Sequence, residues 1–424
     1  MMNGTYPSTL VSHTQAYLCV LITLLLALGC DSEQSSTPPN VEDAGILDVG
    51  APDSDAMAMD AAVGDMASEE TDAMTVDADT DSGPSVNAEM IWNELRAQID
   101  NADVRAMVVM FGDASGPRFV HEKSAQRDQI FPIASASKLV TAVLILKLVE
   151  EGVLALGDHP QQYLGDLGWT NDPEDARSRV TLAQLLSFTS GFAGGTGLGL
   201  DEGIECINTG ATADGETSLE ACVMDIYQNH FSFEPGTTYF YGPAHMHIAA
   251  AMAAQATGDR WGRLFRRYLY EPLGMTGTTG YNLPSTENPR ASGGMVMNAD
   301  NYAKLLTALM NGTLLSAESM IELTRDHTPI GTRFESVPAT ADEYGDWHYG
   351  FGCWRECPDS EYSEACDGPS VISSPGAFGF YPWFDQERGY WGLISTQIRL
   401  RGSSITVPLG HAWYTQAIEA LDQP

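Results

Sequence analysis

Basic residues are almost absent from the first quarter of this chain. No Lys or Arg precedes Arg96, whereas fifteen Asp and Glu residues stand between Asp31 and Ala88. The whole chain of 424 residues has a formal net charge of −36. Because this excess of negative charge repels phosphate backbones, the composition argues against nucleic acid as a partner. The same charge favours solubility.

Aromatic residues are also missing from the acidic segment. Residues 31–87 contain no Phe, Trp or Tyr and are rich in Asp, Ala, Ser, Thr and Met. A segment of this composition cannot bury enough apolar surface to fold. We therefore predict that residues 30–87 form a disordered, self-repelling tether. An acidic binding tail would have the same composition, so that alternative stays open.

The N-terminal region lacks an apolar run long enough to cross a bilayer. The run at residues 16–29 is short and is typical of the central part of a signal peptide. Its end, Leu26-Ala27-Leu28-Gly29, precedes Cys30 and resembles the lipobox of bacterial lipoproteins. This resemblance implies that residues 1–29 are removed and that a lipid on Cys30 anchors the protein to a membrane of the bacterial cell envelope, facing the periplasm or the exterior. A non-cleaved anchor and plain secretion are the alternatives.

The cysteines divide according to this export. Two of the seven lie in or beside the signal segment, and five remain: Cys206, Cys222, Cys353, Cys357 and Cys366. An exported compartment permits disulfides, and we predict that Cys206 and Cys222 bracket the polar loop between them. Among the three later cysteines, we favour pairing of Cys357 with Cys366. No histidine or second close cysteine pair completes a zinc ligand set, so no metal is expected.

Hydrophobic periodicity places ordered structure over residues 88–424. The pattern predicts a helix at 88–100, a hairpin of strands at 104–111 and 118–121, and a long helix from Ser135 to about 151. Further predicted helices are 180–187, 218–228, 245–256, 261–270, 299–310 and 411–421, and further predicted strands are 347–354, 379–384 and 390–395. Strands at both ends of a helical stretch predict an α+β fold. In it, an antiparallel sheet of distant segments is flanked by helices and carries a large helical insert region.

The strongest chemical signal is a serine and a lysine at the head of the long apolar helix. Ser135 and Lys138 are three residues apart, and residues at this spacing share a helical face. The chain has only four lysines, and Lys138 alone has a serine three residues before it. Because burial disfavours the charged lysine, its neutral amine can take a proton from the serine. A polar helix start followed by a snorkelling lysine is the bland alternative.

Two further stretches suggest parts of a catalytic site. Residues 234–243, Glu-Pro-Gly-Thr-Thr-Tyr-Phe-Tyr-Gly-Pro, place tyrosines just past a turn. A phenol beside a cationic lysine is shifted toward phenolate and can act as base and then acid. Residues 373–379, Ser-Ser-Pro-Gly-Ala-Phe-Gly, precede a predicted strand, and their small side chains let a backbone N–H approach a substrate carbonyl. A buried aromatic cluster and an ordinary turn are the respective alternatives.

Together these stretches resemble the serine β-lactamase and penicillin-binding-protein superfamily, in the branch of class C β-lactamases and family VIII esterases. Ser135-Ala136-Ser137-Lys138 matches its Ser-x-x-Lys motif, and the Pro-Gly-Thr-x-Tyr-x-Tyr run places Tyr241 at its catalytic tyrosine. Residues 185–192 look like its Leu-Leu-x-His-Thr-Ser-Gly segment, with Phe188 replacing the histidine. Residues 292–295 look like its Ser-Gly-Gly segment.

The resemblance implies an enzyme that forms an acyl-enzyme on Ser135, with Lys138 and Tyr241 transferring protons. It implies that the N–H groups of Ser135 and Ala377 form the oxyanion hole. Ser374, Gly376 and Phe378 would contact a small-molecule or peptide substrate, and no cofactor is implied.

Two departures bear on the substrate. Pro243 stands where the family has asparagine, and Ser374 stands where it has the lysine or histidine that meets a substrate carboxylate. We therefore expect esters or amides, with short-chain esters preferred to β-lactams, unless Arg290 or Arg333 supplies the missing charge. The departures also leave open an inactive cell-envelope binding module with the same fold.

Two other features of the sequence are not expected to bind a ligand. His245 and His247 are two residues apart in a predicted helix, where such side chains do not share a face, so they are not expected to bind metal. Residues 191–203 are rich in glycine but lack the preceding strand of a nucleotide site and are predicted to be a loop.

Overall fold

A computed structural model describes residues 86–194, 204–329, 331–336, 347–357, 371–399 and 401–423. The predicted signal peptide, Cys30 and the body of the predicted tether therefore lie outside the described residues, as do most of loop 191–203 and Cys366. No helix in the described ranges is long and apolar enough to cross a membrane.

The main sheet joins the two ends of the folded region, as the sequence predicts. In the described part of the chain it has seven strands in the order β2-β1-β12-β11-β10-β9-β8. The hairpin of β1 and β2 pairs antiparallel with β12, with Met107 opposite Thr396. The strands are β1 (Met107–Asp113), β2 (Gly116–Lys123), β8 (His348–Tyr349), β9 (Trp354–Glu356), β10 (Val371–Ser373), β11 (Tyr381–Asp385) and β12 (Tyr390–Thr396).

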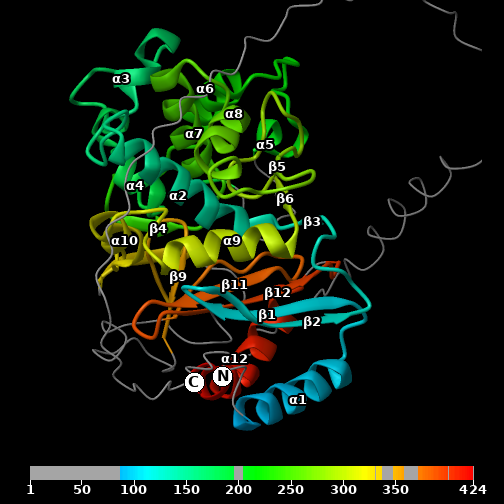
Figure 1. Cartoon of the computed structure of the whole chain (residues 1–424). Helices are drawn as coiled ribbons and strands as arrows, with labels where there is room; N and C mark the ends of the chain where they lie inside the picture. Colours follow the sequence, from blue (N-terminus) through cyan, green and yellow to red (C-terminus); the bar gives the residue numbers. More distant parts are fainter. Residues whose placement is uncertain are drawn as a thin grey trace, which may run out of the picture. The chain divides into compact units, whose positions relative to one another are not determined.

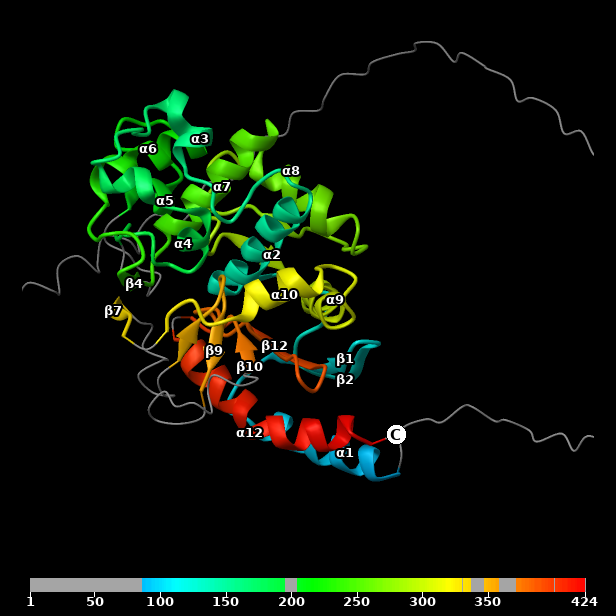
Figure 2. The same cartoon turned by 90° about the vertical axis from the view of Figure 1, so that its left-hand side faces the viewer.

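Helices cover both faces of this sheet (Figure 1). On one face the terminal helices α1 (Val86–Asn101) and α12 (Ser403–Leu421) pack against each other and against the sheet, as Figure 2 also shows. On the other face α9 (Ala299–Met310) contacts β1, β2 and β12. The sheet is thus buried on both sides, which explains why β1 is buried along almost its whole length.

The helical insert region is built around two helices that are apolar on nearly every face. These are α2 (Ser137–Glu150) and α7 (Ala244–Thr257), which pack against each other. A helix that is hydrophobic all round must be buried by other elements. The remaining helical elements of the described chain are α3 (Gln161–Leu164), α4 (Leu182–Leu186), α5 (Glu205–Thr209), α6 (Leu219–Asn229), α8 (Trp261–Phe265), α10 (Ala317–Thr324) and the single-turn η1 (Ala134–Ala136), η2 (Gly165–Leu167), η3 (Ala176–Arg179) and η4 (Arg266–Tyr270).

The described chain also has two small sheets, whose short strands the sequence pattern did not predict. One small sheet has the order β3-β6-β5, and β4 pairs in parallel with β7. Their bounds are β3 (Phe131–Pro132), β4 (Thr238–Phe240), β5 (Gly280–Tyr281), β6 (Met295–Met297) and β7 (Arg333–Ser336). Strands of two to four residues are too short to show an alternating pattern, so periodicity cannot reveal them.

Two predicted boundaries were wrong for identifiable reasons. The last helix begins at Ser403, eight residues before the predicted start, and contains Pro408. Gly410 in that helix packs on the ring of Tyr381, so tertiary contact rather than helix propensity maintains this stretch. The predicted strand at 347–354 is in fact two short strands, β8 and β9, joined by a turn in which Gly352 has φ 66°.

One of the two predicted cysteine pairs is confirmed. Cys206 and Cys222 are joined by a disulfide with an Sγ–Sγ distance of 2.09 Å. Cys357 is also disulfide-bonded, but Cys366, which the sequence favours as its partner, lies outside the described residues. Cys353 is a buried free thiol, and burial raises its pKa to about 12.

Candidate active site

The candidate nucleophile lies in a turn rather than in the predicted α-helix. Ser135 is the central residue of the 3₁₀ turn η1, and α2 begins only at Ser137. Side chains at i and i+3 eclipse each other in a 3₁₀ turn, so the offset start still brings the serine and the lysine together. Ala134 has φ 46°, a left-handed conformation that costs a non-glycine residue about 1–2 kcal/mol. The turn is therefore maintained by its surroundings.

Lys138 faces Ser135 as the sequence predicts. Its Nζ lies 3.0 Å from Ser135 Oγ and 2.9 Å from the carbonyl oxygen of Ser292, and the residue is only 5% exposed. Ser292 begins the Ser-Gly-Gly segment and precedes β6. The lysine thus bridges the nucleophile and a segment more than 150 residues away in the chain.

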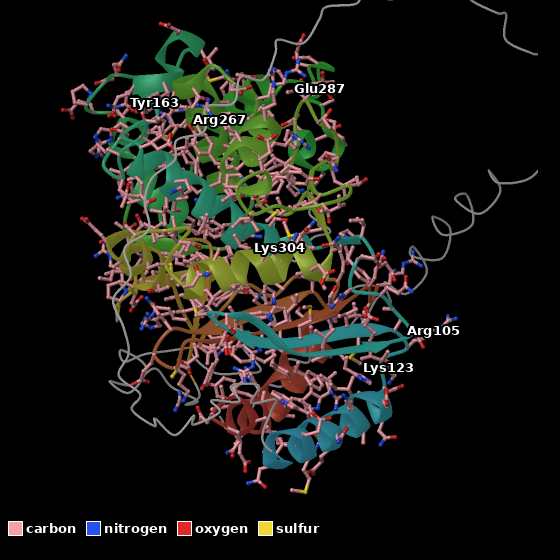
Figure 3. The ribbon with its side chains drawn as sticks, in the orientation of Figure 1. Arg105, Lys123, Tyr163, Arg267, Glu287 and Lys304 are labelled. Atoms are coloured by element: carbon pink, nitrogen blue, oxygen red, sulfur yellow. A yellow bond between two sulfur atoms is a disulfide. The ribbon has the colours of Figure 1, made fainter. Side chains whose placement is uncertain are left out.

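The other three lysines have ordinary structural contacts. Lys123 donates to the carbonyls of Ile99 and Ala102 at the end of α1, where a cation stabilises the helix terminus. Lys304 on α9 donates to the Gly274 carbonyl, and Lys147 pairs with Glu150. Figure 3 labels Lys123 and Lys304, which belong to the sheet and its covering helix. The scarcity of lysine therefore does make Lys138 distinctive.

Tyr241 is the third residue of the candidate catalytic group, after Ser135 and Lys138. It directly follows β4, is 3% exposed, and forms a side-chain hydrogen bond with Ser135. The Nζ of Lys138 lies 4.6 Å from the centre of its ring. Burial raises the pKa of Tyr241 well above its ordinary value, although the hydrogen bond from Ser135 opposes this shift. The expected shift toward phenolate is therefore wrong, because desolvation of the buried phenol outweighs the hydrogen bond from Ser135.

Aromatic side chains hold the Tyr241 ring. Trp354 stacks on it with ring centres 5.5 Å apart, and Phe188 meets its edge at the same separation. Phe188, which replaces the family's histidine, is fully buried and lies 4.8 Å from the ring of His245 in a stacked arrangement. Its role here is apolar packing. Of these contacts, Trp354 carried no sequence signal, because it reaches the tyrosine from a strand more than a hundred residues later.

The backbone N–H groups of Ser135 and Ala377 are the predicted donors of the oxyanion hole. Within the described chain, no backbone carbonyl accepts a hydrogen bond from the N–H of Ser135 or Ala377. A Cβ at Gly376 would overlap the carbonyl oxygen of Ile133, so glycine is needed for the loop after β10 to approach the nucleophile turn. This close approach brings the loop that carries Ala377 to the nucleophile turn, and the part of Ala377 in an oxyanion hole stays a prediction.

The structure changes the interpretation of Ser374. Its hydroxyl donates toward the carbonyl oxygens of Ser135, at 3.1 Å, and Gly352, at 3.3 Å. The residue is only 3% exposed. Its hydroxyl donates to the protein backbone, including the nucleophile's own peptide, and its contact with substrate stays a prediction. Gly376 is buried, whereas Phe378 is half-buried and remains a candidate for substrate contact.

The residues that bear on the missing lysine or histidine have contacts of their own. Pro243 lies at the start of α7, as its N-cap, and has no side-chain amide. Arg333 forms an ion pair with Glu335 and is largely exposed. Arg290 donates to the side-chain oxygen of Asn208.

The two buried histidines of α7 have separate partners. His245 contacts Ser190 Oγ at 2.8 Å and the Phe240 carbonyl at 2.9 Å, and because a carbonyl only accepts, Nε2 carries the proton. His247 contacts the Asn288 side chain at 2.8 Å. Burial lowers the pKa of each to about 4, so both are neutral at pH 7. Their side chains converge on no common ligand position.

The fold and this group define a class, the β-lactamase-like serine hydrolases. The chain belongs to the Beta-lactamase family, whose model matches residues 98–406. A lovastatin esterase from Penicillium rubens is 27% identical over 241 residues, which cover 51% of this chain and 58% of the esterase. The chain therefore spans less than two thirds of that relative.

Solved structures show the same fold. A protein of Bacteroides dorei described as a β-lactamase has a TM-score of 0.62 and 23% identity, and the match covers 78% of this chain and 98% of that one. EstCE1, described as a hydrolase with promiscuous acyltransferase activity, has a TM-score of 0.59 and 17% identity, with 79% and 98% covered.

Proposed function

We propose that the protein is a serine hydrolase that forms an acyl-enzyme on Ser135 and cleaves carboxylic esters or amides. The observation that supports this most directly is the position of Ser135 Oγ. It is hydrogen-bonded to both Lys138 and Tyr241. Within the described chain, the N–H groups of Ser135 and of Ala377, in the loop that approaches the turn, donate to no backbone carbonyl. This combination offers a base, an acid and an oxyanion site around one oxygen.

Acylation follows from the protonation that burial imposes on Tyr241. Since the resting phenol is neutral, the base for Ser135 is the neutral amine of Lys138, which accepts the hydroxyl proton as Oγ attacks the carbonyl carbon. The N–H groups of Ser135 and Ala377 hold the resulting oxyanion. Collapse of this intermediate breaks the bond to the leaving alkoxide or amine, which takes the proton of Tyr241.

Deacylation returns each proton to its starting group. The Tyr241 phenolate takes a proton from water, and the hydroxide attacks the acyl carbon. When the second tetrahedral intermediate collapses, the Ser135 oxygen leaves and takes the proton held by Lys138. The free acid departs, and serine, lysine and tyrosine regain their resting states.

We further propose that neutral acyl esters are the preferred substrates. A desolvated carboxylate next to the scissile carbonyl needs a charged partner, and an unpaired buried charge costs several kcal/mol. Here Ser374 is engaged with the backbone and Pro243 has no amide. One charge-assisted hydrogen bond is worth about 1.5–3 kcal/mol, so its loss lowers kcat/KM for a carboxylate substrate about 10- to 150-fold. The lovastatin esterase relative is consistent with an ester substrate.

The experiment compares kcat/KM for p-nitrophenyl butyrate and nitrocefin on one preparation of the full chain, with Ser135→Ala as control. We expect faster ester hydrolysis that disappears in the variant. A preference for nitrocefin would reveal a carboxylate site and overturn the substrate proposal. Equal rates in wild type and Ser135→Ala, with no labelling by a fluorophosphonate, would favour the inactive binding module.

Export and lipid anchoring remain proposals from the sequence around Cys30. We propose that the mature protein begins at this acylated cysteine and is attached to a membrane of the cell envelope. Labelling of growing cells with a radioactive or clickable fatty acid tests the proposal. Label is expected on the wild-type protein and not on Cys30→Ala, and equal labelling of both would refute it.

A further inference from the structure

The oxyanion hole depends on how the peptide group before Ser135 is oriented. A peptide is planar and trans, so its carbonyl oxygen and its N–H point in opposite directions. The carbonyl of Ala134 and the N–H of Ser135 belong to one such plane. Any group that fixes the Ala134 carbonyl therefore fixes the direction of the Ser135 N–H as well.

Ser137 is that group. Its Oγ lies 2.6 Å from the Ala134 carbonyl oxygen, which also accepts the Ser137 backbone N–H. The same Oγ accepts a hydrogen bond from the N–H of Met295 in β6 at 3.3 Å. The residue is fully buried. A buried hydroxyl anchored to a neighbouring strand thus holds a peptide whose first residue, Ala134, is in a strained left-handed conformation.

Ser374 holds the peptide on the other side of the nucleophile. Its hydroxyl reaches the Ser135 carbonyl, which belongs to the peptide that follows the nucleophile, and also the Gly352 carbonyl. With both flanking peptides held, the direction of the Cα–Cβ bond of Ser135 is set. The side-chain oxygen then points to Lys138 without reorganisation.

The second N–H of the hole is held in a comparable way. Ala377 N–H belongs to the peptide whose carbonyl is that of Gly376, and this carbonyl accepts the N–H of Gly379 at 2.8 Å. Each hole donor is therefore part of a peptide that is bonded at its opposite end. For the Ala377 peptide this bond comes from the backbone N–H of Gly379. For the Ser135 peptide it comes in part from the Ser137 side chain, which a mutation can remove.

We propose that Ser137 and Ser374 are positioning residues, which align the Ser135 N–H and Oγ for the transition state without touching a reacting atom. This inference rests on the proposed function of Ser135 as nucleophile. In this proposal, Ser374 orients the peptide that follows the nucleophile, and Ser137 orients the N–H that stabilises the oxyanion.

The expected effect is smaller than loss of a hole donor. Removing one donor outright lowers kcat about 10²- to 10³-fold, whereas here the N–H remains and is only less well aimed. A misplacement of about 1 Å can itself cost 10²-fold. Because the Ser137 backbone N–H still holds the Ala134 carbonyl, we expect kcat to fall about tenfold in Ser137→Ala and in Ser374→Ala, with KM within about twofold.

The test uses p-nitrophenyl butyrate with the full-length protein, and kcat is expressed per active site titrated with a fluorophosphonate. A boronic acid that forms a tetrahedral adduct on the serine supplies a second readout, and its inhibition constant should rise about tenfold in parallel with the fall in kcat. Ser137→Thr keeps the hydroxyl and should recover most of kcat. Titration separates misalignment from a loss of folded protein.

Thr257→Val is the control. Thr257 is a half-buried residue at the C-terminal end of α7, and its hydroxyl donates to the Ala253 carbonyl at 2.7 Å, in the same helix and at the opposite end from Pro243. This variant should lower the melting temperature while kcat per titrated site stays within twofold of wild type.

The outcomes separate this inference from the function on which it depends. If the wild type hydrolyses esters and both alanine variants keep wild-type kcat and boronate affinity, the positioning role is wrong. If wild type and Ser135→Ala are equally inactive, the proposed function has failed instead. Should Ser137→Ala not fold, Ser374→Ala decides by the same two readouts.

Discussion

Replacement of Tyr241 by phenylalanine tests the proton transfers separately. The variant loses the hydroxyl that is hydrogen-bonded to Ser135 and keeps the ring that packs against Trp354 and Phe188. The proposed mechanism gives this hydroxyl two tasks, as acid for the leaving group in acylation and as base for water in deacylation. A substrate with a good leaving group needs only the second task.

The magnitudes show that chemistry rather than folding should decide the result. A positioned acid or base contributes about 10²- to 10⁴-fold, which corresponds to about 3–5 kcal/mol of transition-state stabilisation. Loss of one hydrogen bond lowers the free energy of unfolding by only about 0.5–1.5 kcal/mol. Since the ring contacts stay, Tyr241→Phe should remain folded while its turnover falls by two to four orders of magnitude.

The assay is rapid-mixing kinetics with two esters of the same acid. With p-nitrophenyl butyrate, whose phenolate leaves without protonation, Tyr241→Phe should release about one equivalent of product in a burst and then turn over slowly, because deacylation is impaired. With ethyl butyrate no burst is expected, because the alkoxide needs the acid. Steady-state rates close to wild type for both esters, or no burst with the activated ester, would refute the two-task assignment.

Three other outcomes are expected. Burial lowers the pKa of His245, His247 and His327 to about 4, so these side chains stay neutral in the native state, whereas the unfolded state binds protons below about pH 6.5. The free energy of unfolding should therefore fall as the pH drops from 6.5 toward 4, by at most about 3 kcal/mol for each histidine. Urea unfolding at pH 7 and pH 5 should show a shallower pH dependence in His247→Gln, and an unchanged dependence would count against this reasoning. Replacing Cys206 and Cys222 together by serine should lower the free energy of unfolding by about 3 kcal/mol with kcat unchanged, and equal denaturant midpoints with and without the disulfide would contradict it. Removing residues 31–85 should leave kcat/KM for p-nitrophenyl butyrate unaltered, and a loss of more than a few-fold would show that this segment takes part in activity.

The sequence by itself determined the parts of this protein that depend on local pattern. The long apolar stretch of α2 predicts a buried helix, because a helix without a polar face has to be covered. The Ser-x-x-Lys spacing predicts the contact between Ser135 and Lys138, because three residues bring two side chains to one side of either an α-helix or a 3₁₀ turn. Strands at both ends of a helical stretch predict the sheet of distant segments, which the pairing of β1 with β12 confirms.

Only the tertiary structure decided the features that depend on segments far apart in the chain. The protonation of Tyr241 follows from how completely Trp354 and other distant residues cover it, and no local pattern measures that burial. The Ser374 hydroxyl donates to the Ser135 carbonyl, a contact between residues 239 positions apart that no local pattern reveals. The strained Ala134 turn likewise persists because β6 and the loop after β10 hold it, and such support becomes visible only when the distant segments are assembled.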